Sequence, residues 1–127
     1  MKILIVEPDA MRQRQLRTIL ASLGHKSAEI ETVPDAKTAI NTLRKKRFEC
    51  TFLSMTPPLD GIALLKEIRA GSSTKTLPSI VYSSDVTKEN VISAAEAGAT
   101  TFLAYPFSVS DVELVMKQAV AKAQSAS

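Results

Sequence analysis

The residues with the clearest chemical potential are two carboxylates that follow the first apolar run of the chain. Glu7 and Asp9 come directly after this run and are separated by Pro8. Carboxylate oxygens bind hard cations such as Mg²⁺, but such a site needs oxygen ligands that converge from more than one segment. Leu53, near the end of the third apolar run, offers no oxygen. Asp9 precedes a helical pattern, so we interpret it as a helix N-cap and predict no metal site.

Nucleophilic and phosphate-binding chemistry finds little support elsewhere in the sequence. His25 is the only histidine and lies beside Gly24 in a predicted surface loop. Cys50 is the only cysteine, and its place within an apolar run indicates a buried structural thiol. The turn at Pro8 lacks a backbone N–H, and its flanking carboxylates repel phosphate, so it does not fit a nucleotide or flavin. We therefore predict a protein that is not an enzyme and carries no cofactor.

Composition and charge indicate one folded domain. The chain has 127 residues, of which 45% are hydrophobic and 23% charged, as in a domain of ordinary size. One cysteine excludes a disulfide scaffold, and no apolar run approaches the roughly 20 residues that a membrane helix needs. The first residues are too short an apolar stretch for a signal peptide. We expect a cytoplasmic protein, with a domain over residues 1–122 and a frayed tail over residues 123–127.

Apolar runs alternate five times with amphipathic stretches. The predicted strands are Lys2–Val6, Ala28–Val33, Phe48–Ser54, Pro78–Tyr82 and Thr101–Ala104. Of the predicted helices, the first is capped by Asp9, the fourth covers Asp85 to Ala97, and the fifth is opened by a capping box at Ser110 and Glu113. This alternation predicts an α/β fold with a doubly wound parallel sheet in the order 2-1-3-4-5. Ligands of such sheets lie beyond the carboxyl ends of the strands.

The chain resembles a response-regulator receiver domain of the chemotaxis-regulator kind, which serves two-component signalling. The segments that carry the resemblance extend over essentially the whole chain: Lys2–Asp9, Pro57–Gly61, Leu64–Arg69, Lys88–Ala99 and Tyr105-Pro106-Phe107. The resemblance implies a flavodoxin-like (βα)5 fold. It also implies a phosphoryl-accepting aspartate at the end of strand 3 and an acid pair after strand 1 that holds Mg²⁺. A Ser or Thr after strand 4 and a Lys before a cis-proline after strand 5 would bind the acyl phosphate.

Most of these family residues are replaced in this sequence. The acid pair is Glu7-Pro8, and the lysine position holds Tyr105. The accepting aspartate of the family stands seven residues before the Asp of an Asp-Gly pair, and counting back from Asp60 gives Leu53. Only the hydroxyl remains, as Ser83. The resemblance therefore predicts a vestigial phosphorylation pocket and a degenerate pseudo-receiver that cannot be phosphorylated.

We accordingly predict a protein–protein interaction and regulatory module in phosphorelay signal transduction. The resemblance places the binding face on helix 4, strand 5 and helix 5, where Asn90, Val91, Phe102 and Tyr105 lie. Phe102 takes the position of the aromatic residue that switches in receivers, and plain core packing is the alternative role. Other signalling proteins are the expected partners, and a homodimer through the same face stays open.

Two alternatives to this function stay open. One is an atypical phospho-switch with a different acceptor, although Ser54 points away from Leu53 because side chains alternate along a strand. The other, which we consider less favoured, is a nucleic-acid-binding module. It would use Arg12, Arg14 and Arg17 together with the run Arg44–Arg47, but no recognition helix or stacking platform accompanies them.

The Tyr105-Pro106 peptide bond is a further point on which the family resemblance makes a prediction. We expect this bond to be cis, because the family keeps it so. In that geometry the Tyr105 side chain would fill the space left by the missing lysine. Its hydroxyl would then reach Ser83, Glu7 or solvent.

Overall fold

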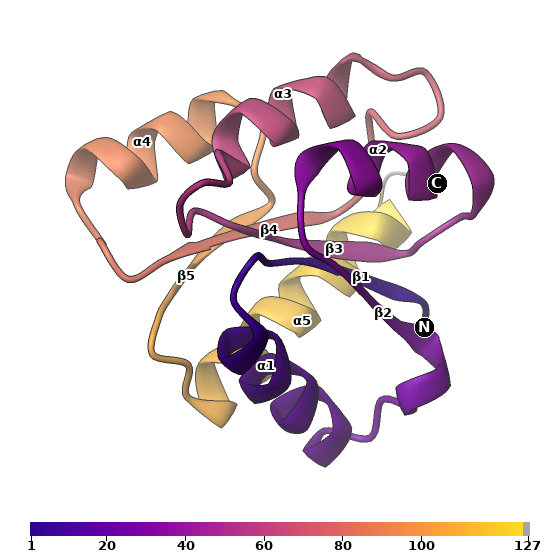
Figure 1. Cartoon of the computed structure of the whole chain (residues 1–127), viewed down its shortest axis with the longest axis vertical. Coiled ribbons are helices and arrows are strands. Elements are labelled where there is room, and N and C mark those ends of the chain that lie inside the picture. The colour runs from indigo at the N-terminus through magenta and orange to yellow at the C-terminus, as the bar shows by residue number, and fades with distance from the viewer. Residues whose placement is uncertain (126–127) are drawn as a thin grey trace.

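Five parallel strands form one sheet in the order β2-β1-β3-β4-β5, which confirms the predicted topology. This computed structural model describes residues 1–125. The strands are β1 (Ile3–Val6), β2 (Ile30–Val33), β3 (Cys50–Ser54), β4 (Ser79–Ser83) and β5 (Thr101–Ala104). The helices are α1 (Ala10–Ser22), α2 (Ala36–Lys45), α3 (Gly61–Ala70), α4 (Lys88–Glu96) and α5 (Val109–Ser125). Figure 1 shows α1 and α5 on one face of the sheet and α2, α3 and α4 on the other.

Side chains of β1 alternate between the two faces of the sheet and so enter two apolar layers. Ile3 and Ile5 pack in the layer beneath α1 and α5, and Leu4 and Val6 pack in the layer beneath α2, α3 and α4. Because the alternation continues past the end of β1, the next residue, Glu7, falls on the α1 and α5 side. The sheet thus delivers a carboxylate to its carboxyl edge, on the face covered by α1.

Side-chain caps fix where the first three helices begin. Asp9 Oδ2 accepts the backbone N–H of Arg12 at 2.9 Å, which confirms the predicted N-cap of α1. Asp35 and Asp60 cap α2 and α3 in the same way. Such a cap contributes about 1 kcal/mol to stability. After α1, Gly24 has a φ of 97°, in the left-handed region that glycine adopts without strain and that is common just after a helix.

The starts of α4 and β2 differ from the prediction. Helix α4 begins at Lys88 rather than Asp85, because the Thr87 side chain is the N-cap. Ser27–Glu29 form a 3₁₀ turn, although residues 28–29 were predicted as strand. This turn is closed by the Glu29 N–H, which donates to the carbonyl of Lys26 at 2.9 Å. Alternation of apolar residues alone did not indicate this local hydrogen bond.

Helix α5 begins at Val109, earlier than predicted. The Ser108 hydroxyl accepts the N–H of Asp111 at 3.1 Å, so Ser108 caps the helix and the predicted capping box at Ser110 is wrong. The helix extends to Ser125. The expected tail over residues 123–127 therefore overlaps its last turn and otherwise lies outside the described residues. Within residues 1–125, no helix is long and apolar enough to cross a bilayer.

Candidate functional site

The carboxyl ends of the strands bring the predicted site residues to one edge of the sheet. Glu7 follows β1, Leu53 lies in β3, Ser83 ends β4 and Tyr105 follows β5. Parallel register places Leu53 between Val6 of β1 and Val81 of β4. The sequence prediction is correct in this respect, because a parallel sheet gathers all strand ends at one edge. The contacts made there differ from those expected.

Leu53 is fully buried and belongs to the apolar layer beneath α2, α3 and α4. Its neighbours in that layer include Val6, Val81 and Leu59. Ser54 faces the opposite side and hydrogen-bonds Thr56, as alternation predicted. The side chain at position 53 is therefore an aliphatic group sealed in the core, with no oxygen to accept a phosphoryl group.

Glu7 is also fully buried, and both of its carboxylate oxygens accept hydrogen bonds from the protein. Oε1 accepts the Tyr82 hydroxyl at 2.8 Å and the Thr56 hydroxyl at 3.3 Å. Oε2 accepts the backbone N–H of Asp9 at 3.0 Å. A buried carboxylate needs such partners, because an unpaired one would carry a large desolvation cost. Glu7 is therefore directed into the protein rather than toward a ligand.

Tyr82 is a site residue that the sequence reasoning missed. It is fully buried in β4, where its hydroxyl donates to Glu7. Burial, followed by the nearby Glu7 carboxylate, raises the pKa of Tyr82 far above its ordinary range, so the phenol stays protonated and remains a donor. The available signal was a tyrosine within an apolar strand, since a buried tyrosine hydroxyl usually has a polar partner. The identity of that partner depends on packing across the sheet.

Thr56 connects this buried pair to α1. Its hydroxyl oxygen accepts from Ser54 Oγ at 2.7 Å and from Arg12 Nη1 at 3.0 Å, and its proton goes to Glu7 Oε1. The backbone N–H of Thr56 donates to Ser54 Oγ at 2.9 Å. The loop between β3 and α3 is thereby tied to both β1 and α1. The Pro57-Pro58 bond in this loop is cis, which the sequence analysis did not predict.

Tyr105 turns toward α1. Its bond to Pro106 is cis, as predicted. The guanidinium carbon of Arg12 lies 4.0 Å from the centroid of the Tyr105 ring, in a cation–π contact. The Tyr105 hydroxyl donates to Gln15 Oε1 at 2.6 Å in an exposed hydrogen bond, so of the three expected surroundings it reaches neither Ser83 nor Glu7 and lies at the solvent side. Because its ring stacks against Arg12, the Tyr105 hydroxyl lies beside α1 and does not point toward Ser83 or Glu7.

Phe107 completes a closed series of contacts. Its ring meets both Tyr82 and Tyr105 edge-on, with centroid separations of 5.0 Å in each case. The series returns to its start through side-chain contacts only, and we term it the contact ring. Its members are Glu7, Tyr82, Phe107, Tyr105, Arg12 and Thr56. The contact ring joins β1, β4, the β3–α3 loop, the β5–α5 loop and α1.

Ser83 lies beside the contact ring and has a local role. It is 7% exposed, and its hydroxyl accepts the N–H of Asp85 at 2.9 Å. Ser83 and Asp85 line a cleft of about 320 Å³, with Arg12 and Thr56 on its other side. This cleft lies at the carboxyl edge of the sheet.

Three of the four predicted interaction residues, Asn90, Val91 and Phe102, lie on or next to α4, whereas Tyr105 turns toward α1. Asn90 donates its side-chain amide to the Asp85 carbonyl at 2.8 Å and so holds the β4–α4 loop. Val91 and Ile92 are 38% and 44% exposed. Phe102 is half-buried against the layer beneath α4. α4 thus presents apolar side chains to solvent, and whether Phe102 switches stays a prediction.

Residues 3–117 match the protein family described as the response regulator receiver domain. The chain belongs to this family. It is 32% identical over 114 residues to chemotaxis protein CheY-3 of Vibrio cholerae serotype O1, covering 89% of this chain and 86% of that protein. A putative response regulator from Chloroflexus aurantiacus has a TM-score of 0.87 and 26% identity, over 94% of this chain and 97% of that one.

A third relative bears on the metal. The receiver domain of a sensor histidine kinase from Pseudomonas aeruginosa was solved with magnesium in its active-site cleft. Its fold matches that of this chain with a TM-score of 0.82 at 24% identity, over 94% of this chain and 97% of that one. The residues of the present receiver domain do not fit Mg²⁺. Both oxygens of Glu7 are engaged internally, Asp9 Oδ2 caps α1, and Leu53 offers no ligand. Within residues 1–125, no three His, Cys, Asp or Glu side chains gather where they could hold a metal ion.

The other candidate residues serve the structure. Burial raises the pKa of the Cys50 thiol to about 12, so the thiol stays protonated and unreactive. Burial lowers the pKa of His25, which lies between the end of α1 and α5.

Arg17 Nη1 donates to the Ile30 carbonyl at 2.8 Å and to the Thr32 hydroxyl at 2.9 Å. Two of the three α1 arginines, Arg17 and Arg12, are thus engaged within the protein, which weakens the nucleic-acid alternative.

Proposed function

We propose that this receiver domain is a phosphorylation-independent interaction module in two-component signalling. The observation that carries the proposal is the contact ring, together with the buried Leu53 beside it. The family resemblance implies an acyl phosphate that is bound by side chains of the strand-end loops. Here the same loops are joined by side-chain contacts of Glu7, Tyr82, Thr56, Arg12 and Tyr105.

The chemistry at the strand ends supports this proposal. A phosphoryl group adds about two negative charges, which must be neutralised by nearby cations. Arg12 is the cation at this edge, and it is held between the Tyr105 ring and the Thr56 hydroxyl. Placing a phosphoryl group at position 53 would need a new acceptor and a metal site. The remaining role for such a domain is to present a fixed surface.

The outer face of α4 is the surface that we propose for partners. Val91 and Ile92 expose apolar area there, and burial of apolar area is the main favourable term in most protein–protein association. Other signalling proteins are the proposed class of partner. Because the protein's own side chains join the strand-end loops in the contact ring, we propose that docking on this face does not require a phosphodonor.

The first experiment measures phosphorylation directly. The purified protein is incubated with acetyl phosphate and Mg²⁺, and its intact mass is recorded beside that of a receiver domain with an aspartate acceptor. We expect a phosphoryl adduct on the control receiver only. An adduct on this chain that maps to Ser54 or Thr56 would instead establish the atypical phospho-switch.

The second experiment measures docking. The immobilised domain is used to capture proteins from cytoplasm of the native organism, with and without acetyl phosphate. We expect the same captured signalling protein in both conditions and its loss in a Val91→Glu/Ile92→Glu variant. Met11→Glu is the matched control, because Met11 is an exposed apolar residue of α1, at 56% exposure. Capture that depends on acetyl phosphate, or that Met11→Glu abolishes equally, contradicts the proposal.

A further inference from the structure

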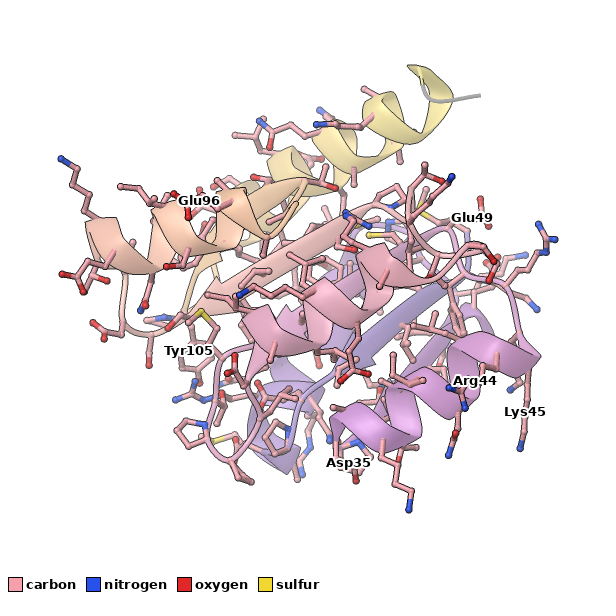
Figure 2. All side chains as sticks on the ribbon, turned by 90° about the horizontal axis from the view of Figure 1, so that it is seen from above. Asp35, Arg44, Lys45, Glu49, Glu96 and Tyr105 are labelled. Atoms are coloured by element: carbon pink, nitrogen blue, oxygen red, sulfur yellow. The ribbon has the colours of Figure 1, made fainter. Side chains whose placement is uncertain are left out.

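A second concave site lies between the end of α2 and the connection from α3 to β4. Its volume is about 300 Å³, at the small end of the range for ligand pockets. Leu43, Phe48 and Leu77 line its apolar part, and Ser73 and Thr74 add hydroxyl groups. The pocket adjoins the amino ends of β3 and β4, whereas the contact ring lies at their carboxyl ends. Figure 2 shows Tyr105 and the Arg44–Lys45 pair at opposite ends of the molecule.

Four consecutive cations, Arg44 to Arg47, line this pocket. Lys46 forms an ion pair with Glu31 at 2.8 Å. Within residues 1–125, no carboxylate pairs with Arg44, Lys45 or Arg47. Figure 2 shows the side chains of Arg44 and Lys45 extended into solvent at the end of α2. Three exposed cations that form no ion pair with the described residues and border one concavity produce a positive potential that attracts anions.

The opposite wall of the pocket is held in place by Arg69. Its Nη1 donates to the Leu77 carbonyl at 2.7 Å, and its Nε and Nη2 donate to the Gly98 carbonyl at 3.0 and 2.8 Å. Thr74 Oγ1 donates to the Ile68 carbonyl at 2.6 Å. These bonds fix the α3–β4 connection before any ligand arrives. Because the partners of Arg69 are carbonyls, its positive charge adds to the potential behind the wall.

We propose that this pocket binds a small molecule with two or more adjacent phosphate groups. Clustered cations suit a compact polyanion, and the apolar floor suits a non-phosphate portion of the same molecule. An extended nucleic acid would need a track of cations along the surface. Arg12 lies in the contact ring at the carboxyl ends of the strands, and Arg17 is bonded to β2, so neither continues such a track from the pocket. The proposal does not rest on the proposed receiver function, since it uses neither the contact ring nor α4.

Isothermal titration with inorganic pyrophosphate at low ionic strength tests the proposal. We expect saturable one-to-one binding that weakens at least about tenfold, or about 1.4 kcal/mol, in Arg44→Gln/Arg47→Gln. Lys66→Gln/Lys88→Gln is the matched control, because both lysines are exposed and the net charge falls equally. That control is expected to change affinity by no more than about twofold, through the weak influence of distant charges. Equal losses in the two double variants would overturn the proposal.

A steric variant separates the pocket from general surface charge. Ser73→Trp keeps every charge and fills the concavity, so we expect it to weaken pyrophosphate binding about tenfold as well. Titration with ADP should match or exceed pyrophosphate, and adenosine should not bind. Unchanged affinity in Ser73→Trp, equal binding of adenosine, or affinity for a single-stranded oligonucleotide that rises with its length contradicts the small-ligand site.

Amide chemical shifts of the wild-type protein provide a measurement that does not depend on any variant. On addition of pyrophosphate, the shifted amides should fall within residues 43–48 and 71–77. Shifts concentrated at the carboxyl ends of the strands, or the absence of saturable shifts, would overturn the assignment. Receiver function would be untouched by that result, because it is tested by the mass and docking measurements above.

Discussion

Replacing Tyr82 with Phe removes one hydroxyl from the contact ring and leaves its aromatic packing in place. The edge-on packing of the residue 82 side chain against the Phe107 aromatic ring is retained, and the 2.8 Å hydrogen bond to Glu7 is lost. Glu7 Oε1 then keeps only the Thr56 hydroxyl, at 3.3 Å. A hydrogen bond to a buried charged acceptor contributes about 1.5–3 kcal/mol. We therefore expect the free energy of unfolding to fall by about 2.5 kcal/mol.

The expected shift in Tm follows from the length of the chain. Unfolding entropy near ~2.1 cal/mol/K per residue, applied to 127 residues, makes about 1 kcal/mol equivalent to about 4 °C. The Tyr82→Phe variant should therefore melt about 9 °C lower. Tyr105→Phe is the matched control, because the same atom is removed from the other tyrosine, whose bond to Gln15 is exposed. That change should lower the free energy of unfolding by about 0.5 kcal/mol.

Urea and thermal unfolding, each measured on both variants, provide the assay. Equal effects of the two changes would refute the assignment of Tyr82 as the main partner of Glu7. A Tyr82→Phe loss below about 0.5 kcal/mol would do the same. A double-mutant cycle with Glu7→Gln should give a coupling free energy of at least about 1 kcal/mol, since the two side chains are in direct contact.

The same hydroxyl makes stability depend on pH in the alkaline range. Burial and then Glu7 raise the pKa of Tyr82 in the native state, while an unfolded tyrosine has a pKa of about 10. The stabilising contribution is therefore complete below about pH 10 and is lost as the pH rises above it. The loss has a slope of up to about 1.4 kcal/mol per pH unit. In Tyr82→Phe this part of the slope should be absent, and an unchanged alkaline slope would contradict the argument.

Three further changes test other parts of the structure. Leu53→Asp places a carboxylate in the apolar layer, so we expect the free energy of unfolding, measured with urea, to fall by about 3 kcal/mol. We also expect no efficient labelling of this variant by acetyl phosphate. Labelling at the rate of an ordinary receiver would contradict this expectation. Gly61→Ala would bring a Cβ into steric conflict with the Ser54 carbonyl oxygen, so we expect a loss of about 1–3 kcal/mol in the free energy of unfolding. A neutral result would mean that the loop relaxes freely. Arg12→Gln removes the cation over Tyr105, so we expect the free energy of unfolding to fall by about 1 kcal/mol. The Tyr105 ring signal in NMR spectra should also change. An unaltered ring signal would argue against the stacking.

The sequence was sufficient for the fold because its local signals agree with one another. Apolar runs, the caps at Asp9, Asp35 and Asp60, and the left-handed Gly24 all indicate alternating strands and helices. The error at the start of α5 arose because two residues of the same kind competed for one position. Ser108 and Ser110 are both good caps, and the choice between them depends on where the chain leaves the cis-proline loop.

The site was predictable in its location and not in its contacts. Parallel strands bring Glu7 and Tyr105 to one edge whatever their partners are. The Tyr82–Glu7 bond joins residues 75 positions apart, and it depends on β4 lying across β3 from β1. The direction of the Tyr105 side chain depends on its stacking with Arg12. Nothing in the type of Arg12 or in its position on α1 indicated that it would stack on an aromatic ring. Such pairings are decided by three-dimensional packing, which periodicity does not encode.

The bonds of Arg17 have a consequence for self-association. Strand β2 lies at one edge of the sheet, where free backbone groups invite another chain to add a strand. Arg17 occupies the Ile30 carbonyl and the Thr32 hydroxyl of that strand, and Lys46 pairs with Glu31 between them. A second strand approaching this edge would have to displace a guanidinium and break an ion pair. The β2 edge is thereby protected against runaway sheet extension and aggregation.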